Sequence, residues 1–507
     1  MPDMTTAVVS ALARHAAASP RRIALTDGRH ELDFAAVERS VSACAAALRC
    51  NAAPRIALAL ENSPAWAIAD LAALAAGVPC VPLPEFFSTT QTLHVLADAG
   101  AGQLITDRPG SYAELLRGAG IAFERVDALV VAGTLLSRFR LRLGRAAALP
   151  PGTAKLTYTS GTTGAPKGVC LGADALARVA QSLAAACRLG RGDRHLALLP
   201  LSTLLENVGG VYAPLLAGAT CVLPPLAAVG MTGAGSLDPD TLLGALDASG
   251  ATTAIVTPQM LHAAVAALEA GRRAPTALRF LAVGGAPLHA SLLGRAAAVG
   301  LPAYQGYGLS ECASVVTLNT PQHDRPGSVG RVLPHARLRI APDGEILVAG
   351  ATALGYCNAP GAAHESWPTG DIGRLDREGY LYLIGRKKNI FITSFGRNVS
   401  PEWVESELAS SGAIAQAWVW GEARPWNAAV LTPAPGCTPA DVEAAVAAAN
   451  RCLPDYARVT AWIASDRPFS AAAGELTANG RPRRDALLAR YRARIDRLYT
   501  EHNQHVL

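Results

Sequence analysis

Apolar and polar positions alternate along the first part of the chain in a way that predicts helices and short strands in turn. Residues 34–48 and 65–76 have apolar side chains at helical spacing. Residues 55–60 (RIALAL), 78–83 and 103–106 form the short apolar runs that are typical of buried strands. Strands that alternate with helices indicate a parallel sheet covered by helices, so this part is expected to have an α/β fold.

The same alternation resumes in the middle of the chain. Helices are expected at 174–188 and 238–248, and strands at 195–199, 219–223, 253–256 and 278–283. Because residues 225–235 are rich in glycine and alanine, we expect a loop between these elements.

From about residue 337 the pattern changes to short strands joined by turns such as residues 342–344 (PDG), which indicates a more β-rich layer. A helix is expected after Ser400, because serine caps helix N-termini, Pro401 fits the first helical position and Glu402 faces the positive end of the helix dipole. Residues 484–499 are expected to form a basic, exposed helix.

One basic segment stands apart from this pattern. Residues 137–145 (SRFRLRLGR) carry four arginines and precede two prolines. We expect a solvated connector there. The alternative is a patch that contacts a membrane surface or a partner.

The composition favours a large folded protein that binds anions. Half of the 507 residues are apolar and 17% are charged, which excludes intrinsic disorder and provides enough core for several folding units. The net charge of +5, with an isoelectric point near 8.7, suits anionic ligands but falls far short of a nucleic-acid-binding protein.

The cysteines and the apolar runs add two expectations. None of the cysteines has CxxC or zinc-site spacing, so we expect free thiols in a reducing compartment. No apolar run reaches the ~20 residues of a membrane span, and the N-terminus has no signal-peptide pattern. We therefore expect no transmembrane segment and a cytoplasmic location.

The most informative chemistry lies in residues 155–172 (KLTYTSGTTGAPKGVCLG). Its glycines let backbone N–H groups approach oxygen atoms closely, and the hydroxyl groups of Ser160, Thr162 and Thr163 provide further donors. Lys167 adds a compact positive charge. A Walker loop needs glycine before its lysine and Ser or Thr after it, but here Pro166 precedes Lys167 and a glycine follows it. The pattern predicts a polyphosphate site of another kind.

Residues 158–168 (YTSGTTGAPKG) resemble the phosphate loop of the AMP-forming adenylating superfamily, and the motif style is most similar to long- or medium-chain acyl-CoA ligases. The resemblance implies a large N-terminal domain of α/β subdomains with a barrel-like part, residues 1–385, and a small mobile α+β domain, residues 386–507. It places the ATP phosphates on Thr159, Ser160, Gly161, Thr162, Thr163, Gly164 and Lys167.

A second motif, residues 305–314 (QGYGLSECAS), contains an aromatic ring that can stack on a purine and a carboxylate that can bind Mg²⁺. It resembles the YGxTE motif of the same superfamily. The resemblance implies that Tyr307 contacts the adenine, that Ser310 lies near the α-phosphate and that Glu311 binds Mg²⁺. The nucleotide site is expected to include the neighbouring small residues Gly306 and Gly308, and Gly284, Gly285 and Ala286 of a GGAP stretch that resembles the loop on the other side of the adenine.

Further motifs follow in the superfamily's order. An aspartate after a glycine turn can accept hydrogen bonds from both ribose hydroxyls, and Asp371 of a TGD motif is expected to do so. By resemblance, Arg386 contacts the ribose or a phosphate, Lys388 is the hinge of the C-terminal domain, and Gly396 leaves room for a pantetheine arm in thioester formation.

The sequence departs from the superfamily near its end. Residues 477–484 (TANGRPRR) carry Arg481 where the superfamily has a lysine that contacts carboxylate and phosphate oxygens. Arginine keeps the charge and offers a bidentate fork, so Arg481 is expected to be catalytic together with Lys167. The alternatives are that Arg483 or Arg484 serves, or that adenylation is slow.

The pocket for the acid is less defined. Leu204, Leu205 and Val208 are candidates for an apolar slot, although they fit a hydrophobic core equally well. Glu206 is the only carboxylate between residues 196 and 219, and a buried unpaired ammonium is costly. This argues against an amino acid and for an uncharged acyl or aryl acid.

The resemblance implies that ATP activates a carboxylic acid, expected to be fatty or otherwise apolar, as an acyl-adenylate. The acyl group then passes to a thiol, either CoA or the phosphopantetheine of a carrier protein. Two alternatives remain. One is an acyl-AMP ligase that feeds an acyl carrier protein or another acceptor without CoA. The other is a nucleotide-binding protein that lost catalysis with its lysine.

Overall fold

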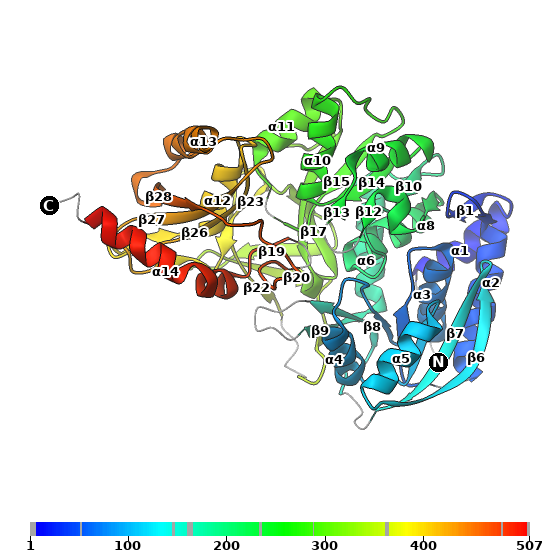
Figure 1. Cartoon of the computed structure of the whole chain (residues 1–507). Coiled ribbons are helices and arrows are strands. Elements are labelled where there is room, and N and C mark those ends of the chain that lie inside the picture. Colours follow the sequence, from blue (N-terminus) through cyan, green and yellow to red (C-terminus); the bar gives the residue numbers. More distant parts are fainter. Residues whose placement is uncertain are drawn as a thin grey trace.

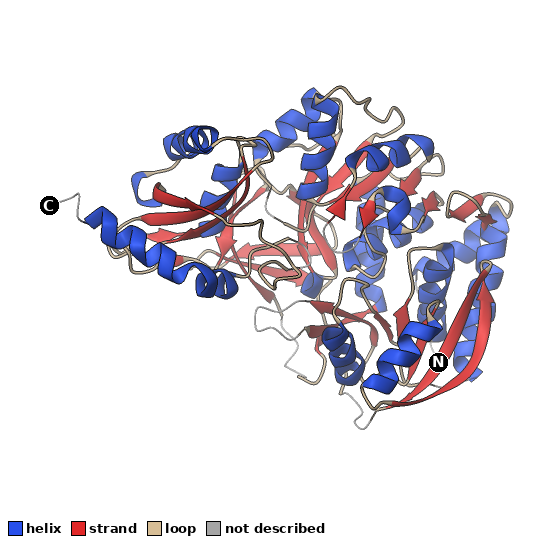
Figure 2. Cartoon of the chain, viewed as in Figure 1, coloured by secondary structure: helices blue, strands red, loops and turns tan. Residues whose placement is uncertain are grey.

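The computed structural model describes residues 7–50, 53–143, 148–159, 166–232, 236–286, 288–359, 365–477 and 480–503. Two large sheets with helices on their faces form most of the molecule, and a smaller group of strands and helices, coloured orange to red, lies to one side (Figures 1 and 2). The structure is therefore a mixed α/β fold with a large N-terminal and a smaller C-terminal domain. The predicted boundary at residue 385 stays a prediction.

The first sheet has nine strands in the order β18-β17-β16-β15-β14-β10-β11-β1-β2. In this order the six strands from β16 through β1 pair in parallel. The strand pairs at both edges of the sheet are antiparallel. In chain order the strands are β1 (Ile23–Thr26), β2 (Glu31–Asp33), β10 (Arg194–Leu196), β11 (Thr220–Val222), β14 (Thr253–Val256), β15 (Phe280–Val283), β16 (Ala303–Leu309), β17 (Ser314–Leu318) and β18 (Arg331–Val332).

The second sheet has eight strands in the order β21-β9-β8-β4-β3-β5-β7-β6, and β8, β4, β3 and β5 are parallel. In chain order they are β3 (Ile56–Ala59), β4 (Cys80–Pro82), β5 (Gln103–Thr106), β6 (Ala122–Val131), β7 (Thr134–Arg142), β8 (Thr153–Thr159), β9 (Lys167–Gly172) and β21 (Gly355–Tyr356). The expected parallel arrangement thus holds for the centre of each sheet, where helices connect the strands.

Helices cover both sheets and bury continuous apolar faces. They are α1 (Ala7–Ala18), α2 (Phe34–Cys50), α3 (Pro64–Ala76), α4 (Thr89–Ala99), α5 (Pro109–Gly118), α6 (Ala173–Ala186), α7 (Leu204–Glu206), α8 (Ala213–Ala217), α9 (Pro239–Ala248), α10 (Pro258–Glu269) and α11 (Ala290–Ala298). A π-helical turn, Asn207–Tyr212, joins α7 to α8, and 3₁₀ turns lie at Leu226–Val229 and Ser310–Cys312. The expected loop at 225–235 also contains β12 (Met231–Thr232), which pairs with β13 (Ser236–Leu237).

A four-stranded antiparallel sheet follows, in the order β19-β20-β22-β23. Its strands are β19 (Ala336–Ile340), β20 (Glu345–Gly350), β22 (Trp367–Leu375) and β23 (Leu381–Arg386). A backbone bridge between Arg331 and Tyr380 connects it to the end of the nine-stranded sheet, and a shared apolar core lies between them. This is the β-rich layer that the short-strand pattern predicts.

The C-terminal domain packs helices around a three-stranded sheet of β26 (Ile414–Trp420), β27 (Asn427–Pro433) and β28 (Val459–Ala464). Its helices are α12 (Pro401–Ala409), α13 (Pro439–Cys452) and α14 (Arg484–Asn503), with a 3₁₀ turn at Asp455–Ala457. A small hairpin, β24 (Phe391–Ile392) and β25 (Asn398–Val399), precedes α12. The helix begins at Pro401 as expected, but Ser400 does not cap it, because its hydroxyl donates to Glu402 Oε2 at 3.3 Å.

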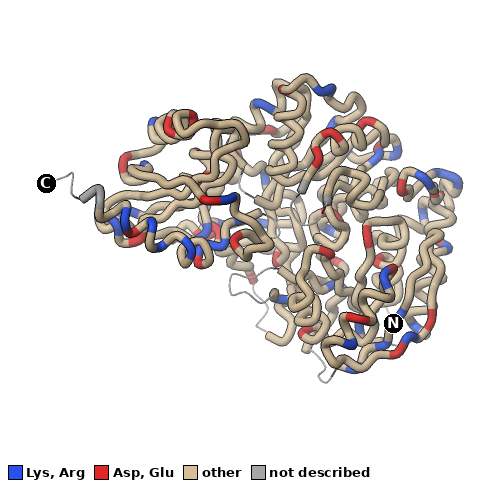
Figure 3. Tube along the Cα trace, in the orientation of Figure 1, with Lys and Arg blue, Asp and Glu red and all other residues tan. Residues whose placement is uncertain are grey.

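Two sequence-based expectations are wrong. The basic segment at 137–145 is not a connector, because its described part continues strand β7 to Arg142 and buries Ser137 and Arg138, whose guanidinium pairs with Asp127. Helix α14 is not simply exposed, because a stripe of side chains four residues apart packs into the core: Leu487, Tyr491, Ile495 and Tyr499. Figure 3 shows that Lys, Arg, Asp and Glu are interspersed along this helix.

Candidate active site

A continuous cavity of about 2070 Å³ lies where the two large sheets, the four-stranded sheet and the C-terminal domain meet. Small-molecule sites are usually about 300–1,000 Å³, so this cavity has room for a nucleotide and a second substrate together. Many of the residues singled out in the sequence line it: Thr159, Lys167, Leu204, Leu205, Gly284, Gly285, Ala286, Gly306, Tyr307, Gly308, Ser310, Glu311, Asp371, Arg386, Lys388 and Arg481.

Two other predicted residues do not line the cavity, and a third group lies outside the described residues. Val208 is fully buried in the hydrophobic core beneath the cavity, so the core reading holds for this residue. Gly396 lies in the turn of the β24–β25 hairpin with a φ of +71°, which glycine adopts without strain. Residues 160–164, which include Ser160, Gly161, Thr162, Thr163 and Gly164, lie outside the described residues.

The glycine-rich loop connects two paired strands. β8 ends at Thr159 and β9 begins at Lys167, and these two residues are partners in the antiparallel ladder. A Cβ atom at Gly168 would lie 2.7 Å from the ring of Tyr158, which is itself fixed by a 2.7 Å hydrogen bond to Asp98. This close packing explains why the residue after Lys167 is glycine. The hairpin therefore presents Lys167 at the edge of the cavity.

Tyr307, Asp371 and Arg386 form one hydrogen-bonded group. The Tyr307 hydroxyl donates to Asp371 Oδ2 at 2.7 Å, and Arg386 Nε lies 2.8 Å from Asp371 Oδ1. Asp371 and Arg386 are partners on the adjacent strands β22 and β23. Burial raises the pKa of Asp371, while Arg386 opposes this shift. The carboxylate oxygens keep lone pairs that can accept further hydrogen bonds, as ribose hydroxyls require.

Glu311 has a partner that the sequence did not reveal. The Tyr356 hydroxyl donates to Glu311 Oε1 at 2.9 Å from β21. The turn after Glu311 is unusual, because Ala313 and Ser314 both have positive φ angles, of 53° and 108°. Such backbone strain is common at functional sites. A single carboxylate on the cavity wall fits Mg²⁺, which takes one or two protein carboxylates and otherwise water and phosphate oxygens.

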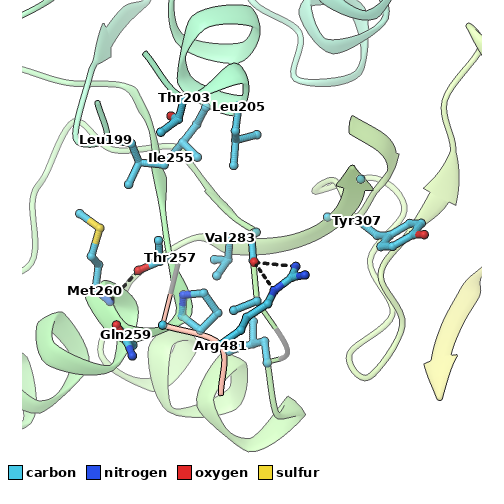
Figure 4. Close-up of a pocket in the computed structure, with 18 of the residues that line it drawn as sticks. Leu199, Thr203, Leu205, Ile255, Thr257, Gln259, Met260, Val283, Tyr307 and Arg481 are labelled. Atoms are coloured by element: carbon cyan, nitrogen blue, oxygen red, sulfur yellow. Dashed lines mark hydrogen bonds between the residues drawn. The ribbon is translucent and has the colours of Figure 1, made fainter. Parts of the chain in front are cut away.

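Arg481 connects the two domains. Its Nε and Nη2 atoms donate to the carbonyl oxygen of Gly285 at 3.1 and 2.8 Å, as Figure 4 shows. Burial and the nearby Arg386 lower the pKa of Arg481 from its ordinary value, and Asp371 acts in the opposite direction. Of the alternatives, Arg484 forms ion pairs within the C-terminal domain, with Glu405 at 2.8 Å and a longer contact to Glu402. Arg481 is thus the arginine of this segment that contacts the Gly284–Ala286 loop.

Two further contacts hold the domains in this arrangement. His289 Nε2, before α11, lies 3.3 Å from Glu407 Oε2 on α12, and Ser291 Oγ donates to the Ser410 carbonyl at 3.3 Å.

Lys388, the predicted hinge, lines the cavity, and burial together with Arg386 lowers its pKa. The centre of the site is therefore positively charged, which favours an anionic ligand.

The part of the cavity next to Leu205 is apolar. Figure 4 shows Leu199, Leu205 and Ile255 grouped there, with Thr203 beside them. Glu206 does not face a ligand, because it is fully buried, receives the Leu199 N–H at 3.1 Å and lies 2.9 Å from His195 Nε2. No sequence motif indicated this histidine–glutamate pair, since its members come from different elements.

A cavity with room for a nucleotide and a second substrate, reached by an arginine of the C-terminal domain, is the arrangement of an enzyme that brings two substrates together. Comparison with known proteins makes this specific. The chain belongs to the AMP-binding enzyme family, whose profile matches residues 12–357, and the profile of the AMP-binding enzyme C-terminal domain matches residues 388–503. It is an AMP-forming acid–thiol ligase.

Three relatives illustrate the similarity. The chain is 29% identical to the long-chain-fatty-acid–CoA ligase FadD15 of Mycobacterium bovis, over 90% of this chain and 89% of that protein. It is 30% identical to the 2-succinylbenzoate–CoA ligase of Bacillus subtilis, over 82% of this chain and 85% of that protein. The solved structure of the O-succinylbenzoate coenzyme A synthetase MenE of Bacillus subtilis, in complex with ATP and a magnesium ion, has a TM-score of 0.71 and 25% identity, and the match covers 94% of this chain and 98% of that one.

The described part of the chain adds two observations. Across those ranges no helix combines the length and the apolar character that a membrane crossing requires. Within the same ranges no three His, Cys, Asp or Glu side chains are grouped to hold a metal ion, so an Mg²⁺ ion at Glu311 would take most of its ligands from water and the nucleotide.

Proposed function

We propose that this enzyme uses ATP and Mg²⁺ to convert an uncharged, apolar carboxylic acid into its acyl-adenylate and then transfers the acyl group to CoA. The observation that carries the proposal is the position of Arg481. It reaches from the C-terminal domain to the Gly285 carbonyl, between the Tyr307–Asp371–Arg386 group and the apolar pocket. A cation there lies at the junction of the two substrates.

The nucleotide would bind along the wall formed by β16, β22 and the β8–β9 hairpin. We infer that Tyr307 stacks on the adenine and that Asp371 accepts the ribose hydroxyls while Arg386 orients it. Thr159, Lys167 and the loop between them would hold the phosphates, with Ser310 near the α-phosphate. Mg²⁺ held by Glu311 would neutralise charge on the phosphate oxygens. The ATP–Mg²⁺ complex of the MenE structure supports this cofactor.

In the first step an oxygen of the acid's carboxylate attacks the α-phosphorus of ATP. An O–P bond forms, the bond from the α-phosphorus to the bridging oxygen breaks, and pyrophosphate leaves with that electron pair. Lys167 and Arg481 are placed to stabilise the charge that develops on the phosphate oxygens. In the second step the thiolate sulfur attacks the acyl carbonyl carbon and AMP leaves.

The acid is proposed to be uncharged apart from its carboxylate, because the side chains grouped with Leu205 in the cavity, Leu199 and Ile255, are apolar. Glu206, which the sequence left as the single candidate, is engaged by His195 and by the Leu199 N–H. A charged group there would lose its hydration without a counter-ion, at a cost of several kcal/mol. The named substrates of the relatives include long-chain fatty acids and 2-succinylbenzoate, so they support a carboxylic acid and not one particular acid.

CoA is the proposed acceptor because the curated relatives are named CoA ligases. No comparison supports a carrier-protein partner. The β24–β25 hairpin carries Gly396 and the exposed Phe395, whose side chain is 75% exposed in this arrangement. Rotation of the C-terminal domain about Lys388 would bring this hairpin to the cavity, where Gly396 leaves space for the pantetheine arm.

The test is acid-dependent exchange of pyrophosphate into ATP across fatty, aryl and amino acids. It is followed by mass analysis of the thioester formed with CoA or with a phosphopantetheinylated carrier protein. Exchange with apolar acids and a CoA thioester are expected. Absence of exchange with every acid would support the nucleotide-binding alternative, and a thioester on the carrier protein alone would support the acyl-AMP ligase.

A further inference from the structure

Helix α4 packs against the β8–β9 hairpin that carries Lys167. The helix and the hairpin share one apolar core, in which Val95 and Leu96 of the helix lie with Leu156 of β8 and Cys170 of β9. None of the described residues of α4 lines the cavity. Any effect of this helix on the reaction therefore has to pass through the hairpin.

Both ends of α4 are capped, so the helix holds its side chains in a fixed register. The Gln91 N–H donates to Ser88 Oγ at 3.2 Å and the Ser88 N–H donates to Gln91 Oε1 at 2.9 Å, which is a capping box. Gly100 ends the helix with a φ of +59°, a conformation that glycine adopts without strain. His94 and Asp98 are four residues apart in this helix and therefore lie on the same face.

His94 holds the residue that precedes Lys167. Its Nε2 lies 3.0 Å from the carbonyl oxygen of Pro166, and because a carbonyl oxygen only accepts, Nε2 carries the proton and donates it. Proline has a fixed φ and no N–H, so it cannot donate to a neighbouring strand. The peptide group between Pro166 and Lys167 is planar, and fixing its oxygen also fixes the plane that contains the Lys167 Cα. His94 therefore constrains the direction in which the Lys167 side chain leaves the backbone.

Asp98 holds the opposite strand of the hairpin. The Tyr158 hydroxyl donates to Asp98 Oδ2 at 2.7 Å, and Asn358 Nδ2 donates to Asp98 Oδ1 at 2.9 Å. Tyr158 is the ladder partner of Gly168, and the Tyr158 ring leaves no room for a Cβ atom at Gly168. Helix α4 therefore supports the backbone on both sides of Lys167.

Lys167 needs such support because of the kind of side chain it has. The side chain is exposed on the cavity wall, and an ammonium on a flexible four-carbon stem loses entropy when it is held in one position. A cation stabilises developing charge best when it is already in place before the reaction. A rigid backbone at Lys167 reduces the number of positions that its ammonium can adopt.

We propose that His94, supported by Asp98, is a positioning residue for adenylation: by fixing the peptide group before Lys167, it directs the Lys167 ammonium towards the phosphates of ATP. The inference rests on the proposed function, because it assumes that Lys167 acts on those phosphates. It assigns a role in the reaction to a helix that lies outside the cavity wall.

The experiment compares pyrophosphate exchange in the wild type and in His94→Leu, which has no donor for the Pro166 carbonyl. The kcat/KM for ATP is expected to fall about three- to tenfold, the effect of one lost hydrogen bond. The inhibition constant of adenosine, which has the base and the ribose but no phosphate, is expected to stay unchanged. His94→Gln places an amide donor near the position of the imidazole Nε2 and is expected to recover most of the loss.

A double-mutant cycle shows whether the effect passes through Lys167. Lys167→Ala has no ammonium to direct, so adding His94→Leu is expected to lower its kcat/KM for ATP by less than about twofold. If His94 supported only the fold, its replacement would cost the same factor in both backgrounds, and this result overturns the inference. Tyr158→Phe removes the hydrogen bond to Asp98 and is expected to show the same pattern as His94→Leu.

Two variants control for effects on folding. His30→Leu makes the same replacement at a surface histidine whose side chain is 77% exposed beside Asp27, and it is expected to behave like the wild type. If His94→Leu does not fold, His94→Asn replaces it in every comparison, because the shorter amide does not reach the Pro166 carbonyl while the side chain stays polar.

The outcomes separate this inference from the proposed function. An unchanged kcat/KM for ATP in the His94 variant overturns the inference, and so does an equal loss of affinity for ATP and adenosine. Both results leave acid activation itself intact. A wild type that releases no pyrophosphate with any acid removes the proposed function, and the inference with it.

Discussion

Replacing Arg481 with alanine tests the central feature of the site. The change removes two hydrogen bonds to the Gly285 carbonyl, at 3.1 and 2.8 Å, and a positive charge that we propose lies between the two substrates. Loss of one preorganised donor to a developing oxyanion costs about 10²–10³ in rate. Arg481 is only half-buried, so water screens its charge. The expected loss of adenylation rate is therefore near the lower end of this range, at about 10²-fold or roughly 2.7 kcal/mol.

The assay separates the two half-reactions. Adenylation is followed as pyrophosphate exchange, and thioester formation is followed from supplied acyl-adenylate and CoA. If Arg481 acts on the phosphate in adenylation, Arg481→Ala slows exchange by about 10²-fold and changes thioester formation by less than about threefold. Arg481→Lys keeps the charge but loses the bidentate geometry, so it is expected to recover part of the exchange rate.

Arg483→Ala is the matched control, because Arg483 lies one residue beyond Pro482 and outside the cavity wall. It is expected to behave like the wild type in both assays. An Arg481→Ala enzyme that exchanges pyrophosphate at the normal rate would refute the assignment, and a loss in Arg483→Ala of the same size would show that the segment matters only through its fold.

Three further predictions follow from other contacts. Tyr356→Phe removes the 2.9 Å hydrogen bond to Glu311, so the Mg²⁺ concentration needed for half-maximal pyrophosphate release is expected to rise about three- to tenfold. An unchanged Mg²⁺ titration would contradict this prediction. Asp371→Asn removes the charge proposed to face the ribose and is expected to raise the KM for ATP about tenfold with little change in the KM for the acid; equal changes in both would argue against a ribose contact. Burial lowers the pKa of His335 to about 4, below its ordinary 6.5, so the folded state resists protonation and loses stability as the pH falls below 6.5. The free energy of unfolding, measured with urea, is expected to be about 2 kcal/mol lower at pH 5 than at pH 6.5 because of this residue. A His335→Gln protein with the same pH dependence would contradict the prediction.

Local pattern was enough for much of the fold. The strands at Gln103–Thr106 and Thr253–Val256 have the predicted bounds, because short apolar runs between turns have few other ways to become buried. The error at 137–145 has a physical reason. Arginines alternate there with Phe139 and Leu141, a strand period that the high charge concealed, and Arg138 is buried because Asp127 on the neighbouring strand pairs with it.

The sequence by itself determined the family and the candidate residues of the nucleotide site. Lys167, Tyr307, Asp371 and Arg481 stand in motifs whose residue types are unusual enough to be read without a structure, and the structure brings all four to one cavity. Such motifs are local in the sequence, so they can be recognised without knowledge of the fold.

Only the tertiary structure decided how those motifs meet and what space lies beside them. The contact of Arg481 with Gly285 and that of Tyr356 with Glu311 join residues far apart in the chain, and no local pattern encodes them. The same holds for Glu206, which the sequence offered as a partner for a charged substrate until the structure placed His195 against it. An empty volume is a property of packing between elements, and for this reason the acyl pocket could not be described from the sequence.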